Sequence, residues 1–144
     1  MKHILTLCIG NICRSPIAEA LLKREFPDKT IWSAGLGALT GNPADLLSME
    51  VAAAHGLDLS AHRAQQLASW MCQAADLILV MEQAHKTEVE QQYPLVRGKV
   101  FRLGELGKFD IADPYRQPQA AFDTAYEAIA LGVANWAPRI RLLG

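Results

Sequence analysis

Short runs of aliphatic residues, separated by helix-like stretches, dominate the hydrophobic pattern of the chain. Four such runs predict β-strands: His3 to Cys8, Thr30 to Ala34, Asp76 to Met81 and Lys99 to Leu103. Their apolar positions are continuous rather than alternating, which is typical of strands that are covered on both faces. Because helical segments lie between the strands, the pattern predicts an α/β fold with a doubly wound, four-stranded parallel sheet and helices on both faces.

The helices are predicted from capping signals and breakers. Ser15 and Pro16 are typical of the cap and first position of a helix, which would end before Pro27. Three further helices are predicted within residues 43–55, 65–73 and 83–92. In the last helix, whose first turn would contain Pro118, apolar residues recur at spacings of three or four. Pro138 should kink or end this helix, because its ring clashes with the carbonyl one turn earlier.

Composition limits the possible partners. The chain has 144 residues, of which 51% are hydrophobic, and this predicts a single domain over residues 1–144. The 14 Lys and Arg residues against 15 Asp and Glu residues give a net charge of 14 − 15 = −1. This balance gives no reason to expect a nucleic acid partner.

No apolar run approaches the ~18 residues of a membrane helix, so we expect no stable membrane insertion and no secretory signal.

The three cysteines are too few, and odd in number, for a disulfide-stapled secreted domain. They are Cys8, Cys13 and Cys72. The sequence therefore predicts thiols in a reducing cytoplasm.

The chemistry is expected in the loop between the first strand and the first helix, which reads Cys-Ile-Gly-Asn-Ile-Cys-Arg-Ser over residues 8–15. A tight turn there directs backbone N–H groups inward, and the positive end of the helix dipole adds to them, so the loop predicts an oxyanion site. Arg14 supplies a planar fork for two phosphate oxygens. The same donors favour an ionised Cys8, a nucleophile that attacks phosphorus to form a phosphocysteine. Ser15 is expected to donate to this thiolate or to cap the helix.

A departing phenolate needs a proton, so the loop predicts a carboxylic acid elsewhere in the chain. Asp113, in an Asp-Pro-Tyr segment before the last helix, is the best candidate. Its loop should overhang the carboxyl ends of the strands, where α/β proteins build their sites. Tyr115 would then form an aromatic wall beside the acid.

Together these segments resemble the low-molecular-weight protein tyrosine phosphatases, particularly bacterial members tied to capsule and exopolysaccharide production. The resemblance covers essentially the whole chain, including the loop, the Ser-Ala-Gly at residues 33–35, the stretch GLDLSAHRAQQL, the strand ADLILVM and the late DIADPY. It implies the phosphotyrosine phosphatase I-like fold, with no cofactor and no metal.

The resemblance also implies roles for individual residues. The catalytic set would be the nucleophile Cys8, the phosphate ligand Arg14, the general acid and then base Asp113, and the thiolate stabiliser Ser15. Asn11, Ser33 and His62 would hydrogen-bond behind the loop and fix its shape. Without the resemblance, the residues themselves favour an ordinary strand-end cap for Ser33 and a satisfied surface or core histidine for His62. The substrate would contact the loop and two walls: Ile9, Gly10, Asn11, Ile12, Cys13, Leu39 and Tyr115, with Leu36 as another apolar candidate.

Two features leave alternatives open. Cys13 matches a second loop thiol of the family, which would form a reversible disulfide with Cys8, or it is simply a small buried residue. Gln65 stands where many members have Arg, and its effect on the pocket is open.

Three functions are compatible with the loop. The first is hydrolysis of phosphotyrosine in a protein, and the resemblance suggests an autophosphorylating bacterial tyrosine kinase of polysaccharide export as the partner. The second is thiol-dependent arsenate reduction, which normally needs further distal cysteines, whereas only Cys72 is available here. The third, a silent phosphate-binding module, conflicts with the joint presence of Cys8, Arg14 and Asp113.

Overall fold

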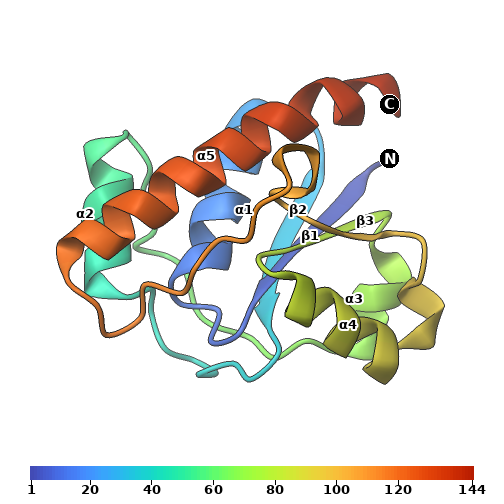
Figure 1. The fold of residues 1–144 in the computed structure, drawn as a ribbon, viewed down its shortest axis with the longest axis horizontal. Helices are drawn as coiled ribbons and strands as arrows, with labels where there is room; N and C mark the ends of the chain where they lie inside the picture. Colours follow the sequence, from blue (N-terminus) through green and yellow to red (C-terminus); the bar gives the residue numbers. More distant parts are fainter.

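The computed structural model describes residues 1–144, and a four-stranded parallel sheet lies at its centre (Figure 1). The strands run in the order β2-β1-β3-β4. Their bounds are β1 His3–Cys8, β2 Thr30–Gly35, β3 Leu77–Val80 and β4 Val100–Arg102. All four strands are parallel, with Ile4 of β1 opposite Ile31 of β2 and Leu77 of β3. The predicted sheet is therefore confirmed, with the last two strands shorter at both ends.

Five α-helices and two 3₁₀ turns complete the fold. They are α1 Arg14–Glu25, α2 Leu46–Ala54, α3 Ser69–Ala74, α4 Gln83–Gln92, η1 Pro94–Val96, η2 Glu105–Gly107 and α5 Gln119–Leu142, and η2 and α5 follow the last strand. None of these helices is long and apolar enough to cross a membrane.

The helices divide between the two faces of the sheet, as the continuous apolar strands predicted. Successive side chains of a strand point to opposite faces. Ile4 belongs to the larger core cluster with residues of α1, α2 and α5, whereas Leu5 and Leu7 belong to the smaller cluster with residues of α3 and α4. Figure 1 shows α1 and α5 on one side of the sheet and α3 and α4 on the other.

Two predicted helix starts are wrong. Helix α1 begins at Arg14, and Cys13 is its cap residue without a capping side-chain bond. Ser15 does not cap the helix, because its hydroxyl is engaged inside the loop described below. Helix α2 begins at Leu46 rather than near residue 43, because the Asp45 side chain accepts from the N–H of Leu47 and thereby caps it.

Pro138 was expected to kink or end α5, and the structure shows that the helix does not end there. The helix continues to Leu142, with Pro138 exposed on its outer side. Ala137 and Ile140 are 5% and 0% exposed, so residues on both sides of the proline pack into the larger core. This burial offsets the hydrogen bond that the proline cannot make.

Candidate active site

The loop of residues 9–13 joins the carboxyl end of β1 to the start of α1. Asn11 adopts a left-handed conformation, with φ of 59°, which Asn tolerates better than most residues. This single residue turns the chain back toward the helix. The loop therefore lies at the edge of the sheet where α/β proteins place their sites.

The carbonyl groups of this loop all point outward to protein donors. Six consecutive carbonyls accept hydrogen bonds: Cys8 from Leu36 N at 3.0 Å, Ile9 from Gly37 N at 3.0 Å, Gly10 from Leu39 N at 3.1 Å, Asn11 from His62 Nε2 at 2.6 Å, Ile12 from Asp45 N at 2.9 Å and Cys13 from Ser48 Oγ at 3.2 Å. The segment after β2 supplies most of these donors. The shape of the loop is thus fixed from outside.

The N–H groups of residues 9–13, in contrast, make no hydrogen bond to another protein atom. Unpaired backbone donors are rare in folded proteins when they lie away from solvent. Residues 11–13 are buried as whole residues, and Ile12 and Cys13 line the cavity described below. A concave loop with its carbonyls outward and its N–H groups unpaired is a site for an anion. The predicted oxyanion site requires this arrangement, and the binding of an anion there stays a prediction.

The Cys8 thiol ends a chain of hydrogen bonds inside the loop. Its Sγ lies 3.0 Å from Ser15 Oγ, and Asn11 Nδ2 donates to the same Oγ at 2.8 Å. The orientation of the Asn11 amide is fixed, because its Oδ1 accepts from Gln65 N at 2.9 Å. Since Ser15 Oγ accepts from Asn11, its own proton is available to the Cys8 sulfur. Ser15 is therefore placed as a donor to sulfur and not as a helix cap.

Ser33 and Glu19 extend this chain of hydrogen bonds. Ser33 Oγ accepts from Asn11 Nδ2 at 3.0 Å and donates to Glu19 Oε1 at 2.5 Å. Glu19 was missed by the sequence analysis, because nothing in the pattern separates it from an ordinary polar residue of α1. Ser33 and His62 both contact Asn11, as the family resemblance implied.

Gln65 takes part in the same support. Besides its backbone bond to Asn11, its Nε2 donates to the Ser33 carbonyl at 2.9 Å. The side chain thus ties the 65–67 segment to the end of β2 rather than entering the cavity.

Arg14 is 1% exposed and is held by groups that lie far away in sequence. Its Nη1 donates to Glu82 Oε2 and to the Ile111 carbonyl, both at 2.6 Å, and its Nη2 lies 3.6 Å from Asp113 Oδ2. Its Nε makes no hydrogen bond within the protein. The Glu82 contact was not predicted, because it spans 68 residues and no local motif marks it.

A cavity of about 340 Å³ opens above Cys8. Its lining combines the predicted nucleophile, the arginine and the acid with apolar walls: Cys8, Ile9, Gly10, Ile12, Cys13, Arg14, Gly37, Leu39, Asp113, Tyr115 and Arg116. Gly37 and Arg116 were not predicted. Asn11, predicted as a substrate contact, does not line the cavity, because its side chain is buried behind the loop. Leu36 packs against the smaller core instead.

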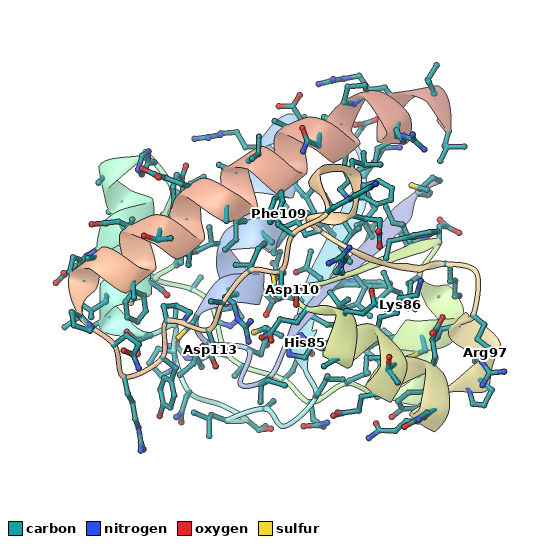
Figure 2. The ribbon with its side chains drawn as sticks, viewed as in Figure 1. His85, Lys86, Arg97, Phe109, Asp110 and Asp113 are labelled. Carbon is teal, nitrogen blue, oxygen red and sulfur yellow. The ribbon has the colours of Figure 1, made fainter.

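The carboxylate of Asp113 is oriented by its own turn. Its Oδ1 accepts from Tyr115 N at 3.0 Å, a local bond typical of Asp in turns. Figure 2 shows Asp113 on the segment that crosses toward the start of α5. Arg116 has a left-handed φ of 63°, and its guanidinium lies 5.1 Å from the Tyr115 ring centroid. The acid, the ring and the cation therefore share one side of the cavity.

The other two cysteines differ from Cys8 in their surroundings. All three are free thiols. Burial, with the nearby Asp45 carboxylate, raises the pKa of Cys13 to about 12. Burial also raises the pKa of Cys72, which is 0% exposed in the smaller core. A disulfide between Cys8 and Cys13 stays a prediction. Cys72 is placed as a packing residue, not as a mobile redox thiol.

We expect Gly35→Ala to disturb the loop from behind. A Cβ at residue 35 would lie 2.4 Å from the Ile9 carbonyl oxygen and 3.0 Å from the Ala38 Cβ. Since the Ile9 carbonyl also accepts from Gly37 N, the loop must shift to admit the methyl group. Such overpacking costs about 1–3 kcal/mol. Urea unfolding and phosphate affinity measure the two effects, and a variant that matches wild type in both would contradict this account of the loop.

No group of three or more acidic, histidine or cysteine side chains is arranged to hold a metal ion.

Comparison with known proteins identifies the family. The family model for low molecular weight phosphotyrosine protein phosphatase matches residues 3–142. The probable low molecular weight protein-tyrosine-phosphatase EpsP of Ralstonia nicotianae is 56% identical over 144 residues, which cover 100% of this chain and 99% of EpsP.

Solved structures agree with this match. The structure of Vibrio vulnificus Wzb in complex with benzylphosphonate has a TM-score of 0.93 and 44% identity, and the match covers 96% of this chain and 98% of Wzb. The YwlE arginine phosphatase from Geobacillus stearothermophilus has a TM-score of 0.92 at 29% identity, over 99% of this chain and 94% of YwlE. The chain therefore belongs to the family of low molecular weight phosphotyrosine protein phosphatases, as its loop and its Asp-Pro-Tyr segment predicted.

Proposed function

We propose that this protein hydrolyses phosphotyrosine in protein substrates through a phosphocysteine on Cys8. The main support for this proposal is the loop that follows Cys8, whose carbonyls accept hydrogen bonds from outside the loop and whose N–H groups are unpaired. Donors that are fixed before the substrate arrives stabilise the charge that develops on the equatorial oxygens. Arg14 adds the fork of Nε and Nη2, while its Nη1 stays bound to Glu82 and Ile111.

The reaction has two displacements. In the first, the Cys8 thiolate forms a bond to phosphorus, the bond from phosphorus to the tyrosine oxygen breaks, and Asp113 donates its proton to that oxygen. In the second, Asp113 accepts a proton from water, the water oxygen bonds to phosphorus, and the sulfur leaves as a thiolate. The Ser15 hydroxyl, 3.0 Å from the sulfur, stabilises the leaving thiolate.

The walls of the cavity favour an aromatic substrate. Leu39, Ile9 and Tyr115 surround the opening and are each 36–39% exposed, so they are accessible to a ring that enters above the loop. Benzylphosphonate, the ligand of the related Wzb structure, also joins an aromatic ring to a phosphonate. We expect the longer phosphotyrosine side chain to reach Cys8 from the surface and the shorter phosphoserine to fall short of it.

Replacement of Asp113 tests the acid. We expect Asp113→Asn to lower kcat for a phosphotyrosine peptide by about 10²–10⁴, because the tyrosine oxygen must then leave without a proton. The loss should be smaller for para-nitrophenyl phosphate, whose leaving group needs the proton less. Asp110→Asn is the matched control, since Asp110 lies on the same segment, accepts from Gln83 N and does not line the cavity. Equal losses for the two substrates would contradict the assigned role.

The substrate class is tested in the same assay with peptides that carry phosphotyrosine, phosphoserine or phosphoarginine. Preference for phosphotyrosine supports the proposal, and preference for phosphoarginine would overturn it in favour of the activity that the YwlE name states. For the natural partner we propose an autophosphorylated bacterial tyrosine kinase of polysaccharide export. Loss of the phosphate from such a kinase with wild type, but not with Cys8→Ser, is the expected result.

Arsenate reduction is not favoured. The relatives are named as tyrosine phosphatases, and Cys72, the distal thiol, is fully buried with a raised pKa. A distal resolving thiol must reach the cavity as a thiolate, and Cys72 meets neither condition.

A further inference from the structure

His85 lies behind the phosphate cavity without lining it. It sits in the first turn of α4 and is 6% exposed. Its Nε2 lies 3.5 Å from Glu82 Oε2, the same oxygen that accepts from Arg14 Nη1 at 2.6 Å. Figure 2 shows His85 at the start of α4, near the segment that carries Asp110 and Asp113. The His85 imidazole therefore contacts the Glu82 carboxylate, which in turn binds the Arg14 guanidinium at the cavity.

The surroundings of His85 favour one neutral tautomer. Its Nδ1 is buried and has no hydrogen-bond partner, so a proton there would be a donor without an acceptor. A proton on Nε2 instead faces the Glu82 carboxylate. Burial lowers the pKa of His85, and the positive charge of Arg14 lowers it further, although Glu82, Glu88 and Asp110 act in the opposite direction. At neutral pH the ring is therefore uncharged, with its proton on Nε2.

Glu82 is the more exposed partner of its ion pair with Arg14. Its side chain is 32% exposed, so solvent competes for its oxygens and other rotamers are accessible to it. Arg14, by contrast, is fully buried, and its Nη1 is bound only to Glu82 and to the Ile111 carbonyl. We propose that His85 is a positioning residue, which keeps Glu82 in the rotamer that orients Arg14 toward the phosphoryl group. The inference rests on the proposed phosphotyrosine hydrolysis.

Protonation of His85 should weaken this arrangement. A second positive charge would compete with Arg14 for the same Glu82 oxygen and would repel the guanidinium. Because the folded state lowers the pKa of His85 below 6.5, the unfolded state binds more protons as pH falls below 6.5. The contribution of neutral His85 to stability is therefore complete above pH 6.5 and is lost progressively below it. A variant with a polar residue that does not titrate at position 85 should lack this dependence on pH.

Two replacements of His85 separate positioning from packing. Gln extends an amide N–H to about the place of Nε2 and does not titrate, whereas Leu fills similar space without a donor. At pH 7.5 we expect His85→Leu to lower kcat about tenfold and to weaken vanadate binding, while His85→Gln stays within about threefold of wild type. From pH 7.5 to 5, the ratio of wild-type to His85→Gln kcat/KM should fall. His3→Gln is the matched control, since His3 begins β1 and lies at the opposite end of that strand from Cys8.

Three results would overturn the positioning role. They are a wild-type kcat in His85→Leu, equal losses in the Leu and Gln variants, and a ratio to His85→Gln that does not change with pH. NMR titration of the His85 ring in the wild-type protein is a further measurement. It depends neither on the folding of a variant nor on catalytic turnover. Bound vanadate brings negative charge to Arg14 and should raise the pKa of the ring, so an unchanged titration also contradicts the proposal. Absence of phosphotyrosine turnover in wild type would instead refute the proposed function.

Discussion

Cys8→Ser should lower turnover of a phosphotyrosine peptide by about 10⁴ or more, the largest effect that we expect from any single change. Removal of a nucleophile abolishes the covalent step, and losses of this order are known for such replacements in other hydrolases. Binding of inorganic phosphate should persist, because the N–H groups of residues 9–13 and Arg14 are unchanged. Steady-state kinetics and calorimetric titration measure the two quantities on the same variant.

The matched control for this variant is Cys72→Ala. Cys72 is fully buried in the smaller core, away from the cavity, so its replacement should leave kcat near the wild-type value. Full activity in Cys8→Ser would refute the phosphocysteine route. Loss of activity in Cys72→Ala with an unchanged melting temperature would reopen the question of a distal redox thiol.

The second large effect is expected for Arg14→Lys. An ammonium group cannot bind Glu82, the Ile111 carbonyl and two phosphate oxygens at once, whereas the guanidinium has five N–H donors in one plane. The loss of charge stabilisation in the transition state should lower kcat by about 10³–10⁵, as for other arginines that contact a transferring phosphoryl group. KM should rise as well, because the bidentate contact also binds the ground state.

Arg139→Lys serves as the control for Arg14→Lys, since Arg139 is exposed near the end of α5. Melting temperatures must accompany the kinetics, because Lys at position 14 leaves Glu82 with a poorer partner. A folded Arg14→Lys variant with kcat within tenfold of wild type would show that the loop amides alone stabilise the transition state.

The sheet and the order of its elements were predictable because each strand is a continuous apolar run between helical segments. The segment of residues 83–92 even has the predicted bounds. The start of α1 was not predictable from capping rules, because Ser15 has two competing uses and the sulfur contact prevails. A capping propensity describes one residue in its local context. Whether Ser15 caps the helix or contacts sulfur depends instead on Cys8, which precedes the helix. That residues 1–144 form a single domain stays a prediction.

The candidate site was predictable where its residues are contiguous or marked by a motif. Cys8, Arg14 and Ser15 share one loop, and Asp113 stands in an Asp-Pro-Tyr segment. Glu82, His85 and Glu19 were not predicted, because their significance comes from contacts made only in the folded chain. Leu39 was the predicted apolar contact, with Leu36 as a further candidate. Which of two nearby leucines enters a cavity depends on the path of the loop, and that path is set by the bond from Leu39 N to Gly10 O.

The parallel strands also determine where the two ends of the chain lie. The amino group of Met1 donates to the Leu143 carbonyl at 3.1 Å, and Figure 1 shows both ends together. Met1 precedes β1 and Cys8 ends it, so the two ends of the chain lie at the amino end of β1, whereas the cavity lies at its carboxyl end. A fluorescent protein or an immobilising tag joined to either end would therefore leave the cavity accessible. A short linker between residues 1 and 144, with new ends opened in a distant exposed turn, should give a circular permutant with an intact phosphate loop.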